Sequence, residues 1–353
     1  MQQFFLILTG MAIGAILLVV CKLLLNFRQV LTAKVLSLLL LSSAFFMLMP
    51  WVQGIPLVEF FLVVGAMTNP AFFWMFASTL FQMGEDKEKL HIGHYIALAV
   101  CVCIGAFQYF IYSMGLETSI IRPVALFVAS SLTVLGLVDI FRSWQSDLVE
   151  WRRLFRLVLS VAAGAFLLFT VVIAFIYGHR EFPIFLNYLN IVVICAFAMV
   201  FGYITLVSDS KIVKETLAEY SPEIVKDKVA QPSFVDSQWL EQLNHSMENA
   251  FYYRQVDLTI KILSEHLSIP EHQLRRLINQ HLGYKNFNDY LNRYRVRDAA
   301  QRLADPKLAR IPILTIAIEA GYGSLTTFNK AFKAIKNMTP SEFRKLDGLV
   351  ETE

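Results

Sequence analysis

The sequence has few charged residues and few cysteines for its length. Charged residues make up 17% of the 353 positions and hydrophobic residues 56%, whereas soluble domains carry roughly 25% and 45–50%. A single soluble globular domain is therefore excluded. The four cysteines (Cys21, Cys101, Cys103 and Cys195) lie in apolar runs and form no C-x-x-C pair. We interpret them as small core residues, with no disulfide framework and no zinc site.

Motifs that carry catalysis are also missing. The sequence contains no metal-ligand spacing, no phosphate-binding loop and no nucleophile elbow, and its histidines are scattered. We therefore predict no catalytic residue, no metal site and no cofactor, and we do not expect an enzyme.

The charged residues are unevenly distributed along the chain. Residues 1–208 hold 11 Lys/Arg and 9 Asp/Glu, and residues 209–353 hold 20 and 19. The first part contains seven apolar stretches, each long enough for a helix that crosses a bilayer core. The first stretch has no basic region before it and no cleavage site, so we do not read it as a removable signal peptide. The predicted spans are 3–25, 31–51, 56–82, 93–114, 120–141, 155–177 and 184–207.

Basic residues around the short loops predict the orientation of this bundle. Nine lie on one side before residue 208, and only Arg122 and Arg180 lie on the other. Because Lys and Arg concentrate on the cytoplasmic side, we expect the N-terminus outside the cell membrane and the C-terminal part in the cytoplasm. An odd number of spans agrees with this. The nine are Lys22, Arg28, Lys34, Lys87, Lys89, Arg142, Arg152, Arg153 and Arg156.

Ionisable residues at mid-depth, typical of pumps and carriers, are missing from the spans. The last span has no lysine for a retinal Schiff base, and Asn69-Pro70 predicts a kink in the third helix. Polar residues gather instead at the outer pole. They form either a cup for a small ligand or solvated loops and interfacial anchors. The cup candidates are Glu59, Arg122, Arg180, Asn187 and Asn190.

The polar part of the chain contains two tightly joined helix pairs. Residues 208–237 are polar, with two prolines, and read as a linker. From Trp239 a helical pattern begins, which either packs on its own domain or dimerises. In the first pair, 257–267 and 271–281 are joined by Ser268-Ile269-Pro270. The outer face of the second helix is expected to carry His272, Gln273, Arg275, Arg276 and Asn279.

The second pair runs from Ile311 to Lys336 and turns at Gly321–Ser324, where Ser324 is suited to cap the second helix. We expect Phe328, Phe332 and Ile335 to be buried. Between the pairs, 287–303 forms a stiff connector helix. The exposed residues of the last helix are Thr326, Thr327, Asn329, Lys330, Lys333 and Lys336.

Two helix-turn-helix units on one connector, with a net charge of +8 over residues 254–345 in a chain of net charge +3, indicate binding to double-stranded DNA. Arginine, glutamine and asparagine are the residues that pair with base edges in the major groove.

Residues 239–345 resemble the AraC/XylS-type transcriptional regulators. The motif is Ile316-Ala317, Ala320-Gly321-Tyr322-Gly323-Ser324, Phe328-Asn329-Lys330-Ala331-Phe332-Lys333 and Thr339-Pro340-Ser341-Glu342-Phe343-Arg344, and 287–296 is similar to the family's connector. The resemblance implies contacts to base edges, or only to phosphates, by His272, Gln273, Arg275 and Arg276 and by Thr326, Thr327 and Lys330. Asn337 stands where the family has glycine, which asparagine tolerates.

Together these features predict an all-α protein: a seven-helix membrane bundle (1–207), a linker (208–237), a cytoplasmic DNA-binding domain (238–346) and a tail (347–353). The leading hypothesis is a bacterial one-component regulator whose bundle senses a small-molecule or membrane signal. A homodimer, and contact with RNA polymerase in an activator, would fit this role. The alternatives are a bundle that serves only as an anchor, and a transporter with a DNA-binding tail.

Overall fold

A computed structural model describes residues 2–52, 54–81, 90–116, 121–142, 144–177, 189, 192–193, 234–284 and 286–350. The described residues form helices and no strand, as the sequence predicted. The chain divides into two compact units. The first comprises residues 1–82, 86–142 and 155–220, and the second comprises 83–85, 143–154 and 221–353.

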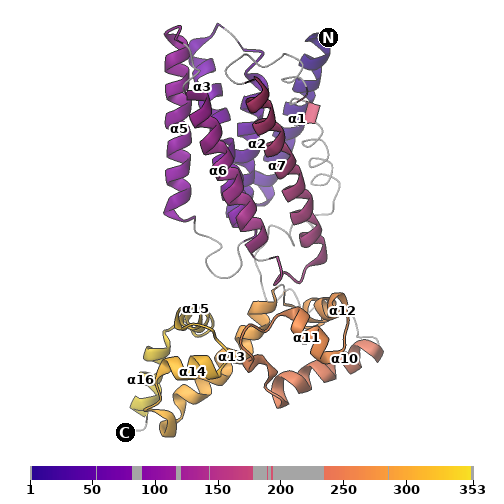
Figure 1. The fold of residues 1–353 in the computed structure, drawn as a ribbon, viewed down its shortest axis with the longest axis vertical. Helices are drawn as coiled ribbons and strands as arrows, with labels where there is room; N and C mark the ends of the chain where they lie inside the picture. The colour runs from indigo at the N-terminus through magenta and orange to yellow at the C-terminus, as the bar shows by residue number, and fades with distance from the viewer. Residues whose placement is uncertain are drawn as a thin grey trace. The chain divides into compact units, whose positions relative to one another are not determined.

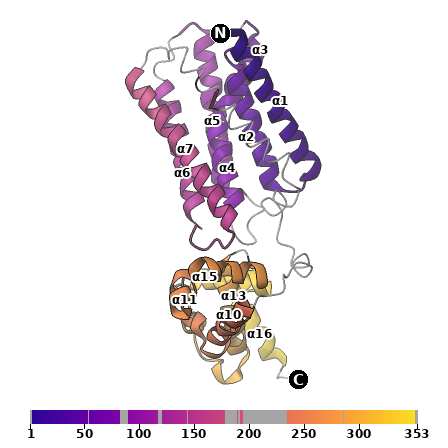
Figure 2. The ribbon, with the colours of Figure 1, turned by 90° about the vertical axis from the view of Figure 1, so that its right-hand side faces the viewer.

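The first unit is a bundle of long apolar helices that run side by side (Figure 1; Figure 2). Its described helices are α1 (Gln2–Asn26), α2 (Leu31–Leu48), α3 (Pro56–Met67), α4 (Asn69–Phe81), α5 (Ile92–Ser113), α6 (Ile121–Arg142) and α7 (Glu150–Tyr177). Helix α4 packs on α2 and α6, and α3 packs on α2 and α5. The core holds Ile16, Leu36, Met47 and Phe76.

Among the described residues of this unit, five helical segments are long and apolar enough to cross a membrane. They are Gln3–Asn26, Leu31–Leu48, Pro56–Phe81, Ile92–Ser113 and Ile121–Arg142, and they coincide with the first five predicted spans. The sixth predicted span lies within α7, and the seventh lies outside the described residues except for residues 189, 192 and 193. Large apolar side chains are exposed on the bundle's surface, including Phe4, Ile92 and Phe127, as suits a surface in contact with lipid.

The third span is interrupted where the kink was predicted. Thr68 separates α3 from α4, and Pro70 lies in the first turn of α4, where proline costs no hydrogen bond. The Asn69 amide Nδ2 donates to the hydroxyls of Ser42 (3.0 Å) and Ser43 (2.8 Å) on α2. The polar side chain at the break is thus satisfied by the neighbouring helix rather than by water.

The second unit consists of short helices grouped around α13 (Phe287–Ala304), with α10, α11 and α12 at one end of α13 and α14, α15 and α16 at the other (Figure 1). The helices before α13 are α10 (Phe234–Asn244), α11 (Ile260–Leu267) and α12 (Glu271–Arg276), which continues as a π-helical turn, η5 (Leu277–His281). Those after it are α14 (Ile313–Glu319), α15 (Leu325–Lys336) and α16 (Pro340–Val350).

Two hydrophobic cores fill this unit, and α13 contributes to both. Phe287, Tyr290 and Leu291 belong to the first core, and Val296 and Leu303 belong to the second. The connector predicted over 287–303 is therefore confirmed as one continuous helix. Helix α10 also packs on the first core, because its Leu243 is fully buried there, which favours the expected packing on its own domain.

Candidate nucleic-acid interface

The first helix-turn-helix unit is α11, the turn Ser268–Pro270, and α12 with η5. The Thr259 hydroxyl caps α11 by accepting from the Ile262 amide (3.3 Å), and Ser268 ends the helix in the left-handed conformation (φ 54°). Leu263, Leu274 and Ile278 are fully buried. Apolar residues at these spacings hold the second helix against the first and leave its opposite face for polar residues.

The polar face of α12 and η5 is partly open. His272 and Arg276 are exposed, and Gln273 and Asn279 are half-buried. Arg276 pairs with Asp236 of α10 at 2.8 Å while keeping 43% of its side chain exposed. The Asn279 amide donates to the Tyr284 carbonyl at 2.9 Å, so this side chain secures the end of the helix.

Arg275 differs from the expectation. The sequence placed it on the outer face of the helix, but its side chain is only 3% exposed. Its guanidinium pairs with Glu271 one turn earlier and donates to the carbonyls of Gln145 and Asp147. A charged side chain is buried in a protein when partners satisfy its donors. Helical spacing alone could not reveal partners more than a hundred residues away.

The second helix-turn-helix unit presents a more open polar face than the first. The Ser324 hydroxyl caps α15 by accepting from the Thr327 amide at 3.3 Å, as predicted. Phe328 and Phe332 are fully buried. Ile335, predicted to be buried, is 38% exposed, because it lies on the edge of the apolar stripe near the helix end. The exposed residues are Thr326, Thr327, Asn329, Lys330 and Lys333, and Lys336 is half-buried.

Both ends of α15 are closed by local hydrogen bonds. Asn337 adopts the left-handed conformation (φ 59°) that ends the helix, as expected. Thr339 and Glu342 then form a capping box for α16: the Thr339 amide donates to Glu342 (2.7 Å) and the Glu342 amide donates to Thr339 (3.2 Å). The hydrogen bond from the Thr339 amide lowers the pKa of the Glu342 carboxyl.

A buried polar junction beside α13 ties the two helix-turn-helix units together. The Arg295 guanidinium donates to the Tyr253 carbonyl (2.7 Å) and the Gln255 carbonyl (2.8 Å), and it lies 5.5 Å from the centre of the Tyr322 ring. Burial lowers the pKa of Arg295 and raises the pKa of Tyr322, but arginine stays charged at neutral pH. Helical periodicity marks Arg295 as a polar position of the connector and does not reveal this junction.

A second set of ion pairs lies on the same side of α13. Arg254 contacts both oxygens of Asp298 at 2.8 and 3.0 Å, and Arg302 pairs with Asp298 and with Glu319 of α14. The bond to Asp298 raises the pKa of Arg254. These groups come from the segment before α11, from α13 and from α14. They therefore fix the two helix-turn-helix units relative to each other.

Residues 263–346 match the model of a family described as helix-turn-helix domain. They form an AraC-type DNA-binding domain. The AraC-type domain thus covers α11 through α16, and DNA-binding transcription regulation is the role of this domain type. A search of the curated proteins found no significant match, and neither did a search of the solved structures.

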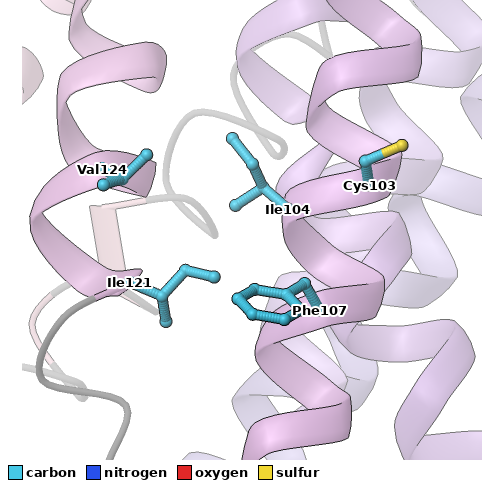
Figure 3. Close-up of a pocket in the computed structure, with 5 residues that line it drawn as sticks. All are labelled: Cys103, Ile104, Phe107, Ile121 and Val124. Carbon is cyan, nitrogen blue, oxygen red and sulfur yellow. The ribbon is translucent and has the colours of Figure 1, made fainter.

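The ligand cup expected at the other end of the chain is described only in part. Glu59 accepts from the Gly54 amide at 2.7 Å, and Arg122 is exposed in the first turn of α6. Arg180, Asn187 and Asn190 lie outside the described residues. Near Arg122, an apolar groove of about 380 Å³ lies between α5 and α6. Its lining residues are Cys103, Ile104, Phe107, Ile121 and Val124 (Figure 3).

Proposed function

We propose that this protein is a membrane-bound one-component transcription regulator that reads specific duplex sites with two helices, α12–η5 and α15. The observation that carries the proposal is the pair of polar helix faces, on α12–η5 and on α15, joined by one connector helix. The described residues of the first part of the chain add five helical segments of membrane-spanning length. The AraC-type domain supplies DNA binding, and the bundle keeps it at the membrane.

The exposed residues of α12–η5 and α15, the two reading helices, are the ones proposed to contact DNA. In the first, His272 and Arg276 reach base edges, because arginine and histidine can donate there. In the second, Thr326, Thr327 and Lys330 lie in the first two turns of α15, the part of a recognition helix that enters the major groove. Lys333 and Lys336 lie further along α15 and contact phosphates.

The rigid connector explains how one chain reads two half-sites. Adjacent major grooves on one face of DNA are about 34 Å apart. A continuous helix whose ends enter two separate cores keeps the reading helices at a fixed spacing. Once one reading helix is bound, the other is already held near its half-site, so the second contact adds binding free energy at a lower entropy cost.

The cell membrane is the proposed location, with the N-terminus outside and the AraC-type domain in the cytoplasm. The bias of nine basic residues against two supports this orientation, and DNA binding requires it. A homodimer and, in an activator, contact with RNA polymerase are consistent with the architecture.

The bundle is proposed to sense a small-molecule or membrane signal at its outer pole. A signal acts on DNA binding only if it prefers one state of the bundle over another. Replacing the bundle by a single unrelated membrane span tests this. We expect the hybrid to bind the same sites but to lose regulation; unchanged regulation would mean that the bundle is only an anchor.

DNA binding is tested with the full-length protein in lipid nanodiscs. A random duplex library is selected on the protein, and the enriched sites are compared with those of Arg276→Ala and Lys330→Ala. We expect a two-part motif that loses definition in one part with each variant. Lys307→Ala, exposed outside the reading helices, is the matched control and should leave the motif unchanged. Selection without enrichment of any duplex would refute the proposal.

A further inference from the structure

The segment between α6 and α7 packs with the C-terminal unit. Residues 143–154 belong to that unit, although the helices on either side of them belong in sequence to the apolar part of the chain. We refer to residues 144–149 as the arm. The predicted topology puts the arm on the cytoplasmic side, where the AraC-type domain is expected.

The arm binds the first helix-turn-helix unit through its main chain. The Arg275 Nη1 donates to the Asp147 carbonyl (2.7 Å) and Nη2 donates to the Gln145 carbonyl (3.1 Å). The Phe287 amide, at the first position of α13, donates to the Ser146 carbonyl (2.9 Å). Asp147 and Asn286 form an isolated antiparallel bridge. Three successive carbonyls of the arm, at residues 145–147, thus accept hydrogen bonds.

One side chain of the arm enters the first core. Leu148 is 1% exposed and belongs to the same cluster as Leu274, Ile278 and Phe287. Burying a leucine side chain is among the stronger contributions that a single residue makes to an interface. The arm is therefore held by an apolar anchor as well as by hydrogen bonds.

Docking of the arm and reading of DNA make opposite demands on Arg275. To reach a base, the guanidinium must be exposed and its donors must be free for the base edge. With the arm docked, the side chain is 3% exposed, and Nε, Nη1 and Nη2 all donate to Glu271 or to the arm. Arg275 follows His272 by three residues, so both lie on the same side of the helix. The arm therefore occupies an edge of the reading face.

We propose that the arm is an inhibitory element that competes with DNA for Arg275, and that it carries the state of the bundle to the AraC-type domain. This inference rests on the proposed function. In the sequence the arm lies one residue after the end of α6 and directly before the start of α7, so a displacement of these helices acts on both of its ends. A signal that favours undocking then raises the affinity for DNA, and DNA raises the affinity for the signal by the same factor.

A reversible crosslink tests the competition. The residues of an antiparallel pair have Cα atoms about 4.5–5.5 Å apart, within the range of a disulfide. In the full-length protein in nanodiscs, Asp147→Cys combined with Asn286→Cys should form a bond that locks the arm, detected by peptide mass. We expect the oxidised protein to bind its selected duplex at least tenfold more weakly than the same sample after reduction.

The controls separate the arm from the proposed function. Asn286→Cys alone and the wild type, treated with the same oxidant, should bind equally well before and after reduction. Equal affinity of the locked and reduced forms overturns the inference, and so does failure of the two cysteines to join. If the reduced form and the wild type bind no duplex at all, the proposed function itself is wrong.

A second variant releases the arm instead of locking it. Leu148→Ser removes the apolar anchor and should raise the affinity for the selected duplex, with Arg275 becoming available. The exposed Leu314→Ser on α14 is the matched control and should leave the affinity unchanged. The inhibitory arm would be contradicted if Leu148→Ser bound the duplex with the same affinity as the wild type or more weakly, while its C-terminal unit kept its hydrogen-exchange protection.

Discussion

Arg295 is the residue whose loss should most weaken the coupling between the two helix-turn-helix units. Its guanidinium makes two charge-assisted hydrogen bonds, to the carbonyls of Tyr253 and Gln255, and is 9% exposed. Such bonds contribute about 1.5–3 kcal/mol each. Arg295→Met keeps the length and apolar stem of the side chain but leaves both carbonyls without this donor. We therefore expect the junction to lose about 3–6 kcal/mol.

The assay is hydrogen exchange of the full-length protein in nanodiscs, followed by mass spectrometry. Amides at the end of α14, such as that of Tyr322, which donates to the Ala317 carbonyl (3.0 Å), and amides in the middle of α13 report the opening of the junction. Because 1.4 kcal/mol corresponds to a factor of ten, Arg295→Met should lower their protection by roughly two to four orders of magnitude. DNA affinity should fall toward that of the better single half-site.

Arg297→Met on the same helix is the control for this prediction. Arg297 pairs with Glu248 at 3.7 Å, and both side chains are more than half exposed. An exposed pair contributes about 0–1 kcal/mol, so protection should change less than tenfold. The reasoning would be refuted if both substitutions caused the same loss, or if Arg295→Met left protection within a factor of ten of the wild type.

Three further substitutions test the reading helices and the junction. Arg276→Ala should cost about 1–3 kcal/mol on the selected site and little on random duplexes, measured by titration; equal losses on both would remove its role in reading bases. Lys336→Ala should weaken binding on all duplexes alike and lower the salt slope by about one in a titration series. Gly321→Ala should destabilise the second helix-turn-helix unit by about 2 kcal/mol or more, because φ is +95° and the new Cβ would lie 2.7 Å from the Tyr253 carbonyl. Hydrogen exchange should show this loss. Gly323→Ala should not show it, because the new Cβ would meet only the Val256 side chain, at an ordinary contact distance of 3.9 Å.

The sequence predicted the helices well because their signals are local. Apolar runs located the first five membrane-length segments, and Pro70 located the break between α3 and α4. Ser324 and Asn337 marked the two ends of α15 through capping chemistry that depends on neighbouring residues alone. The two reading helices, and most of the residues on their faces, were predictable for the same reason.

What the sequence could not predict depends on distant partners. Arg275 and Arg295 both occur at polar positions of a helix, and neither position differs locally from exposed Arg276 or Arg297. Arg275 is buried because carbonyls from residues 145 and 147 reach it, and Arg295 because the segment at Tyr253 folds over it. The fate of a long cationic side chain is thus set by tertiary contacts that helical periodicity does not encode.

Among the described residues, the arm's hydrogen bonds reach α12 and the start of α13 and leave the face of α15 open, and this asymmetry makes a last prediction about the inhibited state. The face of α15, with Thr326, Thr327 and Lys330, is exposed while the arm is docked. The locked disulfide variant should therefore keep weak binding through the second unit instead of losing DNA altogether. In titrations, it should still discriminate base changes in the half-site read by α15 but become less sensitive to changes in the other half-site, where His272 and Arg276 stay exposed and Arg275 is covered. The reduced form should discriminate in both. Insensitivity of the locked form at both half-sites would mean that the arm acts on the whole domain, and not by occupying Arg275.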